Sequence, residues 1–438
     1  MKLRSKKQRV FAGVAALSAA ILALTACGPQ SGSGAGGSGD DGEPAIVWGL
    51  EGGQSASYEL AVERWNEANP DRPIELQMFG NDGYPDKLRI ALGAGQGPAL
   101  MFGWGGGVLQ SYVDAGYVEA IESPEVTDRY LDAVNQNVTF DDSVYGAAIN
   151  NIQPVVVLYN KAVFEEAGAT PPESWDDLME LVPVFNDAGV APIALAGGSK
   201  WPELPYLAYL VDRIGGPEVF DAIVANEPDA WSDPAVAEAV DMIQELVEAG
   251  GFNSDFAALD YSSGAADALL YSGKAAMMVV LSQAYSNIQT KAPDFVASGD
   301  LGYVTFPSVS GGKGDPTDLV GNPSNFWSVT SASSDAHKET VTDFLATEVM
   351  STEYIEEILG RSAVPGVSQA GDLIEELDDD GVQQFVFDLA SDAANFQLSW
   401  DQALSPAQGA ELTLQLDRVF LQEIDAKEFA EVMNGTIE

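Results

Sequence analysis

The sequence contains one cysteine and one histidine in 438 residues, and these shortages exclude common kinds of site. A single cysteine cannot form an intramolecular disulfide, and one cysteine with one histidine cannot make a Cys/His zinc site. Basic residues are also scarce: 20 Lys and Arg stand against 67 Asp and Glu, a net charge of −47. A groove for nucleic-acid phosphates needs the opposite sign. We therefore expect no nucleic-acid partner, no metal and no cofactor.

The first 26 residues are predicted to be a secretory signal peptide. Five basic residues between Lys2 and Arg9 precede an Ala-rich apolar stretch, Val10 to Ala26, which is short for a transmembrane helix. Leu24-Thr25-Ala26-Cys27-Gly28 resembles a bacterial lipoprotein signal, in which the cysteine is lipidated and becomes the new N-terminus. Residues 27–44 are rich in Gly and Ser and predict a flexible linker. We expect acyl chains on Cys27 to hold the protein at the extracellular face of the cytoplasmic membrane.

Strand and helix patterns alternate from residue 45 onward. Apolar or alternating runs predict strands at 46–48, 74–78 and 99–102, and helical spacing predicts helices at 58–68 and 88–92. This order indicates a parallel sheet covered by helices. Ligands of such sheets bind beyond the carboxyl ends of the strands. The loops expected to contribute are 49–57, 79–85 and 103–107.

A second region, from residue 150, has the same alternation. We expect strands at 155–159, 192–195 and 275–281 and a long helix at 234–249. Ser174 precedes an acidic first turn and is predicted to be the N-cap of a further helix. The chain therefore has the length and pattern of two α/β domains.

Several segments after residue 150 resemble the extracellular solute-binding proteins of sugar-uptake ABC transporters. They are VLYNK at 157–161 with Phe164, Ala167-Gly168, Pro171-Pro172 and Trp175; YSGKAAM at 271–277; Phe306-Pro307 with Gly311-Gly312; and the late helix 342–345. They follow one another in the order seen in that family, behind a lipoprotein-like signal.

The resemblance implies a two-lobed, type II periplasmic-binding-protein-like α/β fold, monomeric, whose lobes are joined by hinge crossovers. The crossovers are expected near 145–151, 320–326 and 365–373. The amino-terminal lobe would then comprise 45–149 plus 327–370, and the carboxy-terminal lobe 150–326 plus 371–438. Such a protein captures its ligand by hinge closure and delivers it to membrane permease subunits.

A sugar site needs aromatic rings for the apolar faces of the sugar and amides or carboxylates for its hydroxyls. Three tryptophans, Trp65, Trp175 and Trp231, have the positions of structural residues. The other five lie at strand ends or in loops, where functional aromatics concentrate. These candidates are Trp48, Trp104, Trp201, Trp327 and Trp400, of which Trp400 and Trp201 match stacking positions of the family.

The polar candidates follow strands or lie in the expected crossovers. They are Glu51, Asn81, Asp82, Asn150, Asn151, Asn325, Asp401 and Gln402, with Asn322 beside them and Gln283 at a position where many relatives carry a tryptophan. So broad a set suits a di- to tetrasaccharide. The surroundings of Trp400 resemble binders of plant-derived oligosaccharides such as xylobiose.

Two other functions remain open at this stage. A secreted glycoside hydrolase also needs aromatics and two carboxylates in a cleft, although no motif singles out such a pair among 67 acids. A calcium-dependent surface adhesin is suggested by the acidic run 376–381, but Phe387 stands where an EF-hand loop needs a bidentate Glu. We expect a binding protein and not an enzyme.

Overall fold

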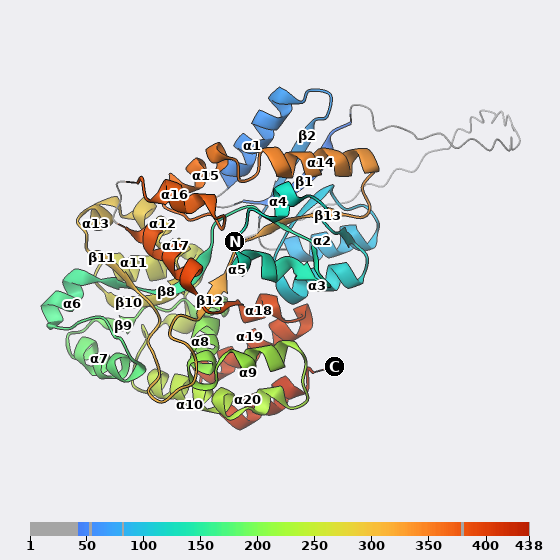
Figure 1. Cartoon of the computed structure of the whole chain (residues 1–438). Helices are drawn as coiled ribbons and strands as arrows, with labels where there is room; N and C mark the ends of the chain where they lie inside the picture. Colours follow the sequence, from blue (N-terminus) through green and yellow to red (C-terminus); the bar gives the residue numbers. More distant parts are fainter. Residues whose placement is uncertain (1–42, 52–54, 81–82, 378–380, 438) are drawn as a thin grey trace, which may run out of the picture. The chain divides into compact units, whose positions relative to one another are not determined.

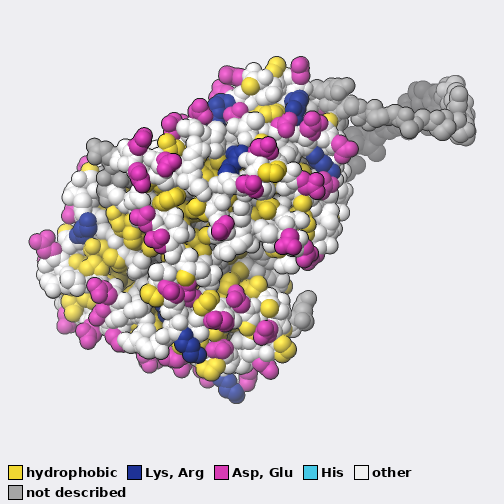
Figure 2. Space-filling view, viewed as in Figure 1, with side chains coloured by type: hydrophobic (Ala, Val, Ile, Leu, Met, Phe, Trp, Pro, Cys, Tyr) yellow, Lys and Arg dark blue, Asp and Glu magenta, His cyan; other side chains and the backbone are white. Residues whose placement is uncertain are grey.

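The computed structural model describes residues 43–51, 55–80, 83–377 and 381–437 (Figure 1). The predicted signal peptide, Cys27, most of the linker, Asn81, Asp82 and residues 378–380 of the acidic run lie outside the described residues. Among the described residues, no helix is both long and apolar enough to cross a membrane. Figure 2 shows Asp and Glu side chains spread over the visible face, with few Lys or Arg side chains between them.

The first sheet has the strand order β2-β1-β3-β13-β4. β1 (Ala45–Leu50), β2 (Ile74–Phe79) and β3 (Leu100–Gly103) are parallel, and α1 (Ser55–Ala68) and α2 (Tyr84–Gly93) connect them, which confirms the predicted alternation. The later strand β13 joins this sheet antiparallel to β3. Its other strands are β4 (Val118–Glu119), β7 (Ala147–Ala148) and β13 (Phe326–Thr330). Its helices are α3 (Gly106–Asp114), α4 (Pro124–Thr127), α5 (Asp132–Asn135), α14 (Asp335–Thr347) and α15 (Thr352–Leu359).

The second sheet has the order β14-β12-β8-β10-β9, with β11 also paired to β8. β10 (Ala275–Leu281) is antiparallel to β8 (Gln153–Asn160) but parallel to β9, and β12 is parallel to β14, so this second sheet is mixed. The chain between these strands is long enough to return in either direction, and alternation alone does not fix strand direction. The other strands are β9 (Ala191–Ile193), β11 (Leu301–Val304), β12 (Leu319–Asn322) and β14 (Phe396–Leu398).

One helix that packs near the second sheet begins at the N-cap residue that the sequence predicts. α7 (Trp175–Asp187) starts with a capping box, in which Ser174 Oγ accepts from the Asp177 backbone N–H and the Asp177 carboxylate accepts from that of Ser174. This confirms the predicted N-cap. The remaining helices are α6 (Lys161–Ala167), α8 (Leu204–Gly215), α9 (Pro217–Val224), α10 (Pro234–Glu248), α11 (Ala265–Tyr271), α12 (Gln283–Lys291), α13 (Pro293–Ala297), α18 (Trp400–Ala403), α19 (Pro406–Phe420) and α20 (Ala426–Asn434).

Each sheet has its own hydrophobic core, so the chain forms the two-lobed α/β fold. Trp65 packs in the first core, and Trp175 and Trp231 pack in the second, all three at 5% exposure or less, which confirms their structural assignment. We call the bodies built on the first and second sheets the amino lobe and the carboxy lobe.

The chain passes from one sheet to the other in two short segments. β7 of the first sheet leads into β8 of the second, and β12 of the second leads into β13 of the first. The third crossing is spread over more residues: Pro365 bridges to Asn151, α16 (Gln369–Ile374) and α17 (Val382–Asp392) follow, and only β14 rejoins the second sheet. The exact lobe limits stay a prediction.

Candidate ligand-binding site

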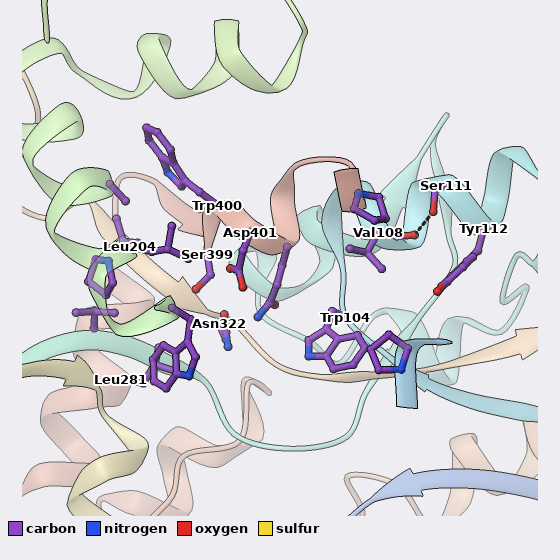
Figure 3. A pocket seen from close by; sticks show the side chains of 18 of the residues that line it. Trp104, Val108, Ser111, Tyr112, Leu204, Leu281, Asn322, Ser399, Trp400 and Asp401 are labelled. Atoms are coloured by element: carbon purple, nitrogen blue, oxygen red, sulfur yellow. Dashed lines mark hydrogen bonds between the residues drawn. The ribbon is translucent and has the colours of Figure 1, made fainter. Parts of the chain in front are cut away.

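A cavity of about 510 Å³ is lined by residues of both lobes (Figure 3). Residues of α2, of the loop after β3 and of α3 line it from the amino lobe. Residues around Trp201, of α8, of α18 and of the strand β12 line it from the carboxy lobe. Its volume falls in the range of small-molecule sites. Because Trp104 lines the cavity and directly follows β3, the cavity lies at the carboxyl end of this strand, where ligands of α/β sheets bind.

Trp104 is the aromatic contribution of the amino lobe. It follows β3 directly and is half-buried. Its ring packs edge-on against Phe102 and Tyr84, with centroids 5.8 and 6.2 Å apart. The Tyr84 hydroxyl donates a 2.8 Å hydrogen bond to the Phe102 carbonyl oxygen, which fixes the supporting ring. These contacts hold the Trp104 indole in one orientation at the cavity wall.

Trp201 is the corresponding aromatic of the carboxy lobe. It begins a short 3-10 turn after Lys200, whose backbone has a φ of 61°, and the Lys200 ammonium lies 2.9 Å from an Asp417 carboxylate oxygen. The indole packs edge-on against Tyr261, with centroids 4.6 Å apart. Ser199 Oγ accepts from the Tyr261 backbone N–H and donates to Asp260, so the two segments are tied together. The Trp201 ring is thus positioned from two sides.

Acceptor oxygens gather at the carboxy-lobe wall of the cavity. The side-chain oxygens of Asn322 and Gln402 are buried and have no hydrogen-bond partner among the described residues. Burial raises the pKa of Asp401 to about 6, although its own backbone N–H and that of Gln402 favour the carboxylate. A buried acceptor without a donor is costly. The wall is therefore suited to a ligand that brings several O–H donors.

Trp400 lines the same cavity, but its ring is 1% exposed and lies in the carboxy-lobe core. It stacks on Phe220 at 5.2 Å, and in Figure 3 its ring points away from Asp401. Its indole N–H donates to Gln397 Oε1 at 3.2 Å, and Gln397 Nε2 donates to Asp212. In this arrangement Trp400 offers no open face for stacking, contrary to the sequence-based expectation.

The other two tryptophan candidates lie in the amino-lobe core and away from the cavity. Trp327 is fully buried, and its indole N–H donates to the Trp48 carbonyl oxygen at 2.8 Å. The Trp48 indole donates to Gln77 Oε1 at 3.1 Å and packs against Phe79. Both side chains are buried within their strands, β1 and β13, and a sequence position near a strand end did not reveal this burial.

The polar candidates of the crossovers hydrogen-bond to one another instead of facing the cavity. Asn150 Nδ2 donates to Asn325 Oδ1 at 2.6 Å, and the Asn325 backbone N–H donates to Asn150 Oδ1 at 2.8 Å. Asn151 Nδ2 donates to Gln283 Oε1 at 2.8 Å. Glu51 is exposed and also lies outside the cavity lining. Buried amides need such partners, so these residues join the crossover segments.

The structure thus brings together Trp104, Trp201, Asp401 and Gln402 of the predicted set, with Trp400 behind them. It adds Tyr112 and Arg89, which line the amino-lobe side, and Ser399, which lies beside Asp401. Tyr112 is on a helix at a spacing that is equally typical of a core residue, so no sequence signal marks it. Among the described residues, no group of His, Cys, Asp and Glu side chains could hold a metal ion.

Glu203, two residues after Trp201, is a buried carboxyl whose oxygens have no hydrogen-bond partner among the described residues. Burial and the nearby Asp417 raise its pKa to about 9, and Lys200 only partly opposes them. The pKa of Glu203 in the folded protein lies above its ordinary value of 4.5. Its contribution to the free energy of unfolding is therefore complete below about pH 4.5 and is lost as the pH rises toward 9.

We therefore expect Glu203→Gln to leave stability unchanged at pH 5 and to raise it by about 1–3 kcal/mol at pH 8.5, since the amide needs no proton to stay neutral. Thermal unfolding at the two pH values measures this. The control is Glu238→Gln, an exposed residue of α10, which should have no such pH-dependent effect. An equal effect of Glu203→Gln at both pH values would contradict the assignment of a neutral carboxyl.

Comparison with known proteins identifies the family. The family model described as bacterial extracellular solute-binding protein matches residues 48–347, more than half of the chain. The chain belongs to the bacterial extracellular solute-binding proteins. This membership agrees with the two lobes and the interlobe cavity, and the members of the family are binding proteins.

Individual relatives match less of the sequence. A probable sugar-binding periplasmic protein of Rhizobium meliloti (strain 1021) is 25% identical over 206 residues, 46% of this chain and 49% of the relative. The chain thus spans about half the length of the curated relatives it matches first.

Solved structures cover nearly all of the fold. A protein studied in connection with xylan utilization by the thermophilic bacterium Caldanaerobius polysaccharolyticus has a TM-score of 0.78 and 25% identity, covering 90% of this chain and 100% of its own. A chitin oligosaccharide binding protein has a TM-score of 0.79 and 22% identity, covering 91% and 98%. The second likeness concerns the fold alone.

Proposed function

We propose that this solute-binding protein captures an oligosaccharide of two to four units by hinge closure and delivers it unaltered to the permease of an ABC importer. The observation that carries the proposal is the cavity between the lobes. There Trp104 and Trp201 come from opposite lobes, Asn322 and Gln402 present buried side-chain oxygens that have no donor among the described residues, and Asp401 adds a carboxylate. A sugar supplies both apolar ring faces and hydroxyl donors.

Xylobiose and longer xylo-oligosaccharides are the ligands we propose first. The expectation from the sequence and the likeness to the protein of xylan utilization both support them. Chitin-derived oligosaccharides are the second ligands to be tested. A diacetylchitobiose binding protein of Streptomyces coelicolor is 30% identical to this chain over 144 residues, 32% of this chain and 30% of the relative. We also propose that the mature protein is anchored through a lipid on Cys27, as the signal-like sequence indicates.

Titration calorimetry with xylo- and chito-oligosaccharides of two to four units tests the ligand. Chromatography of the same mixtures tests whether the sugar is released intact. Binding with unchanged sugar is the expected result. Turnover of more than one equivalent would establish the glycoside hydrolase alternative, and absence of binding to every neutral oligosaccharide would contradict the proposed ligand class.

Asp401 should make the affinity depend on pH. Its carboxylate accepts hydroxyl donors best when ionised, and its pKa in the folded protein is raised to about 6. The affinity should therefore be constant above about pH 7 and fall several-fold as the pH decreases through 6 to 5. Calorimetry at pH 5, 6 and 7.5 measures this. Asp401→Asn should bind more weakly at pH 7.5 and lose the pH dependence; an unchanged profile in that variant would place the titrating group elsewhere.

A further inference from the structure

A second, smaller hollow of about 300 Å³ is also lined by both lobes, and it shares no lining residue with the main cavity. From the amino lobe it is lined by α3, the 3-10 turn Gln136–Val138 and Phe140. From the carboxy lobe it is lined by α9, by β14 with the preceding Asn395, and by Ala403. We call it the rear groove.

The side chains of the rear groove are mostly carboxamides and aromatic rings. Gln110, Gln136, Asn137 and Asn395 supply amides that can both donate and accept. Gln110 is exposed and Asn395 is half-buried, so their side-chain amides are accessible from solvent. Phe140 and Phe220 supply half-buried ring surface, and Asp221 is the only charged lining group.

This combination of side chains suits a neutral molecule with hydroxyl groups. Amides satisfy hydroxyls in both senses without requiring a charge, and phenyl rings cover apolar C–H surface. A hollow of about 300 Å³ lies at the lower limit for small-molecule sites. One or two sugar rings, or a polyol, are therefore the matching ligand size.

The two cavities have a common wall. Phe220 lines the rear groove and stacks on Trp400, which lines the main cavity, with ring centroids 5.2 Å apart and planes inclined by 26°. Gln397 also lines the rear groove, and its Oε1 accepts from the Trp400 indole N–H. Gln136 Nε2 donates to the Phe396 carbonyl oxygen at 3.3 Å and so links the two lobes beside the groove.

We propose that the rear groove is a second, weaker binding site for a small neutral saccharide or polyol, distinct from the main cavity. A ligand there contacts both lobes, so it favours the same lobe arrangement as the main ligand. Occupation of either site should then strengthen the other by an equal factor. The site goes beyond the proposed function, and it does not depend on which oligosaccharide fills the main cavity.

Variants that disable either the main cavity or the rear groove distinguish binding at the two sites. Xylobiose and diacetylchitobiose are titrated in ligand-detected NMR against the wild-type protein and against Trp201→Ala/Asp401→Asn, which disables the main cavity. Weak binding, with a Kd of about 1–10 mM, should persist in the double variant. Adding Val224→Trp, which fills the groove from the end of α9, should weaken that binding at least tenfold.

The matched control is Val184→Trp on α7, because both valines are 39% exposed and Val184 does not line the groove. It should leave the weak binding unchanged. If the double variant binds neither disaccharide, or if Val224→Trp has no more effect than Val184→Trp, the second site is overturned. Failure of the main-cavity proposal is recognised separately, by wild-type binding no tighter than that of the double variant.

Discussion

Trp201→Ala is expected to lower the affinity for the oligosaccharide by about 30- to 1,000-fold, since a buried aromatic anchor contributes about 2–4 kcal/mol. Trp104→Ala should have an effect of similar size, because the two rings come from opposite lobes and each is held by its own aromatic neighbours. Calorimetry with the best-binding oligosaccharide of the panel measures both variants. The unfolding temperature should change little, since both rings are only half-buried.

Ile90→Ala provides the control for this pair. Ile90 is 65% exposed on α2, next to Arg89 of the cavity, and does not itself line the cavity. Its truncation should leave the affinity unchanged. Wild-type affinity in both tryptophan variants would mean that the sugar does not lie between these rings.

Gly107→Ala should have the second large effect, because the lobes meet at this residue. A Cβ atom there would lie 2.5 Å from the Ala403 carbonyl oxygen and 2.8 Å from the Leu404 carbonyl group. The obstruction is backbone of the opposite lobe and cannot rotate away. Gly107 does not have a positive φ, so its own lobe tolerates alanine. The variant should fold normally but keep the lobes from approaching, and its affinity should fall at least about 30-fold.

Gly93→Ala is the matched control for this second prediction. Gly93 is at the end of α2 in the same lobe, and its added Cβ would meet only the Tyr117 hydroxyl at an ordinary 3.8 Å. It should bind normally and be slightly more stable than wild type. Small-angle scattering adds a direct readout: ligand should make the wild type and Gly93→Ala more compact, but not Gly107→Ala. Compaction and normal affinity in Gly107→Ala would show that this contact has no part in closure.

Local patterns in the sequence were sufficient for much of the fold. The alternating and helical runs predicted β1, α1, β2, α2 and β3, and Ser174 marked the start of α7, because these features depend on neighbouring residues. The direction of β10 relative to β8 was not predictable in this way. It is set by pairing between segments more than a hundred residues apart, which no local pattern encodes.

Two of the residues that line the cavity were predictable from their positions in the sequence. Trp104 and Trp201 lie in loops and line the cavity, as their positions indicated. Trp400 and Asp401 are adjacent in the sequence, yet α18 directs the carboxylate of Asp401 into the cavity and the ring of Trp400 into the core beside Phe220. Whether a side chain of α18 faces the cavity or the core depends on the residues that pack around it in the folded protein, and these are distant in the sequence.

The crossover amides illustrate a second limit of the sequence. Asn150, Asn151 and Asn325 have the residue type of sugar-binding groups, and their segments do connect the lobes. Their hydrogen bonds are nevertheless made to Gln283 and to one another. Composition identifies groups able to bind a hydroxyl, but it does not show which of them already have partners.

The most direct test of the central claim is a crystal structure of the protein with the tightest-binding oligosaccharide of the calorimetric panel. We predict an intact sugar between the indoles of Trp104 and Trp201, with its hydroxyls donating to Asp401, Gln402 and Asn322. A sugar bound elsewhere, with the side-chain oxygens of Asn322 and Gln402 still lacking donors, would contradict the account.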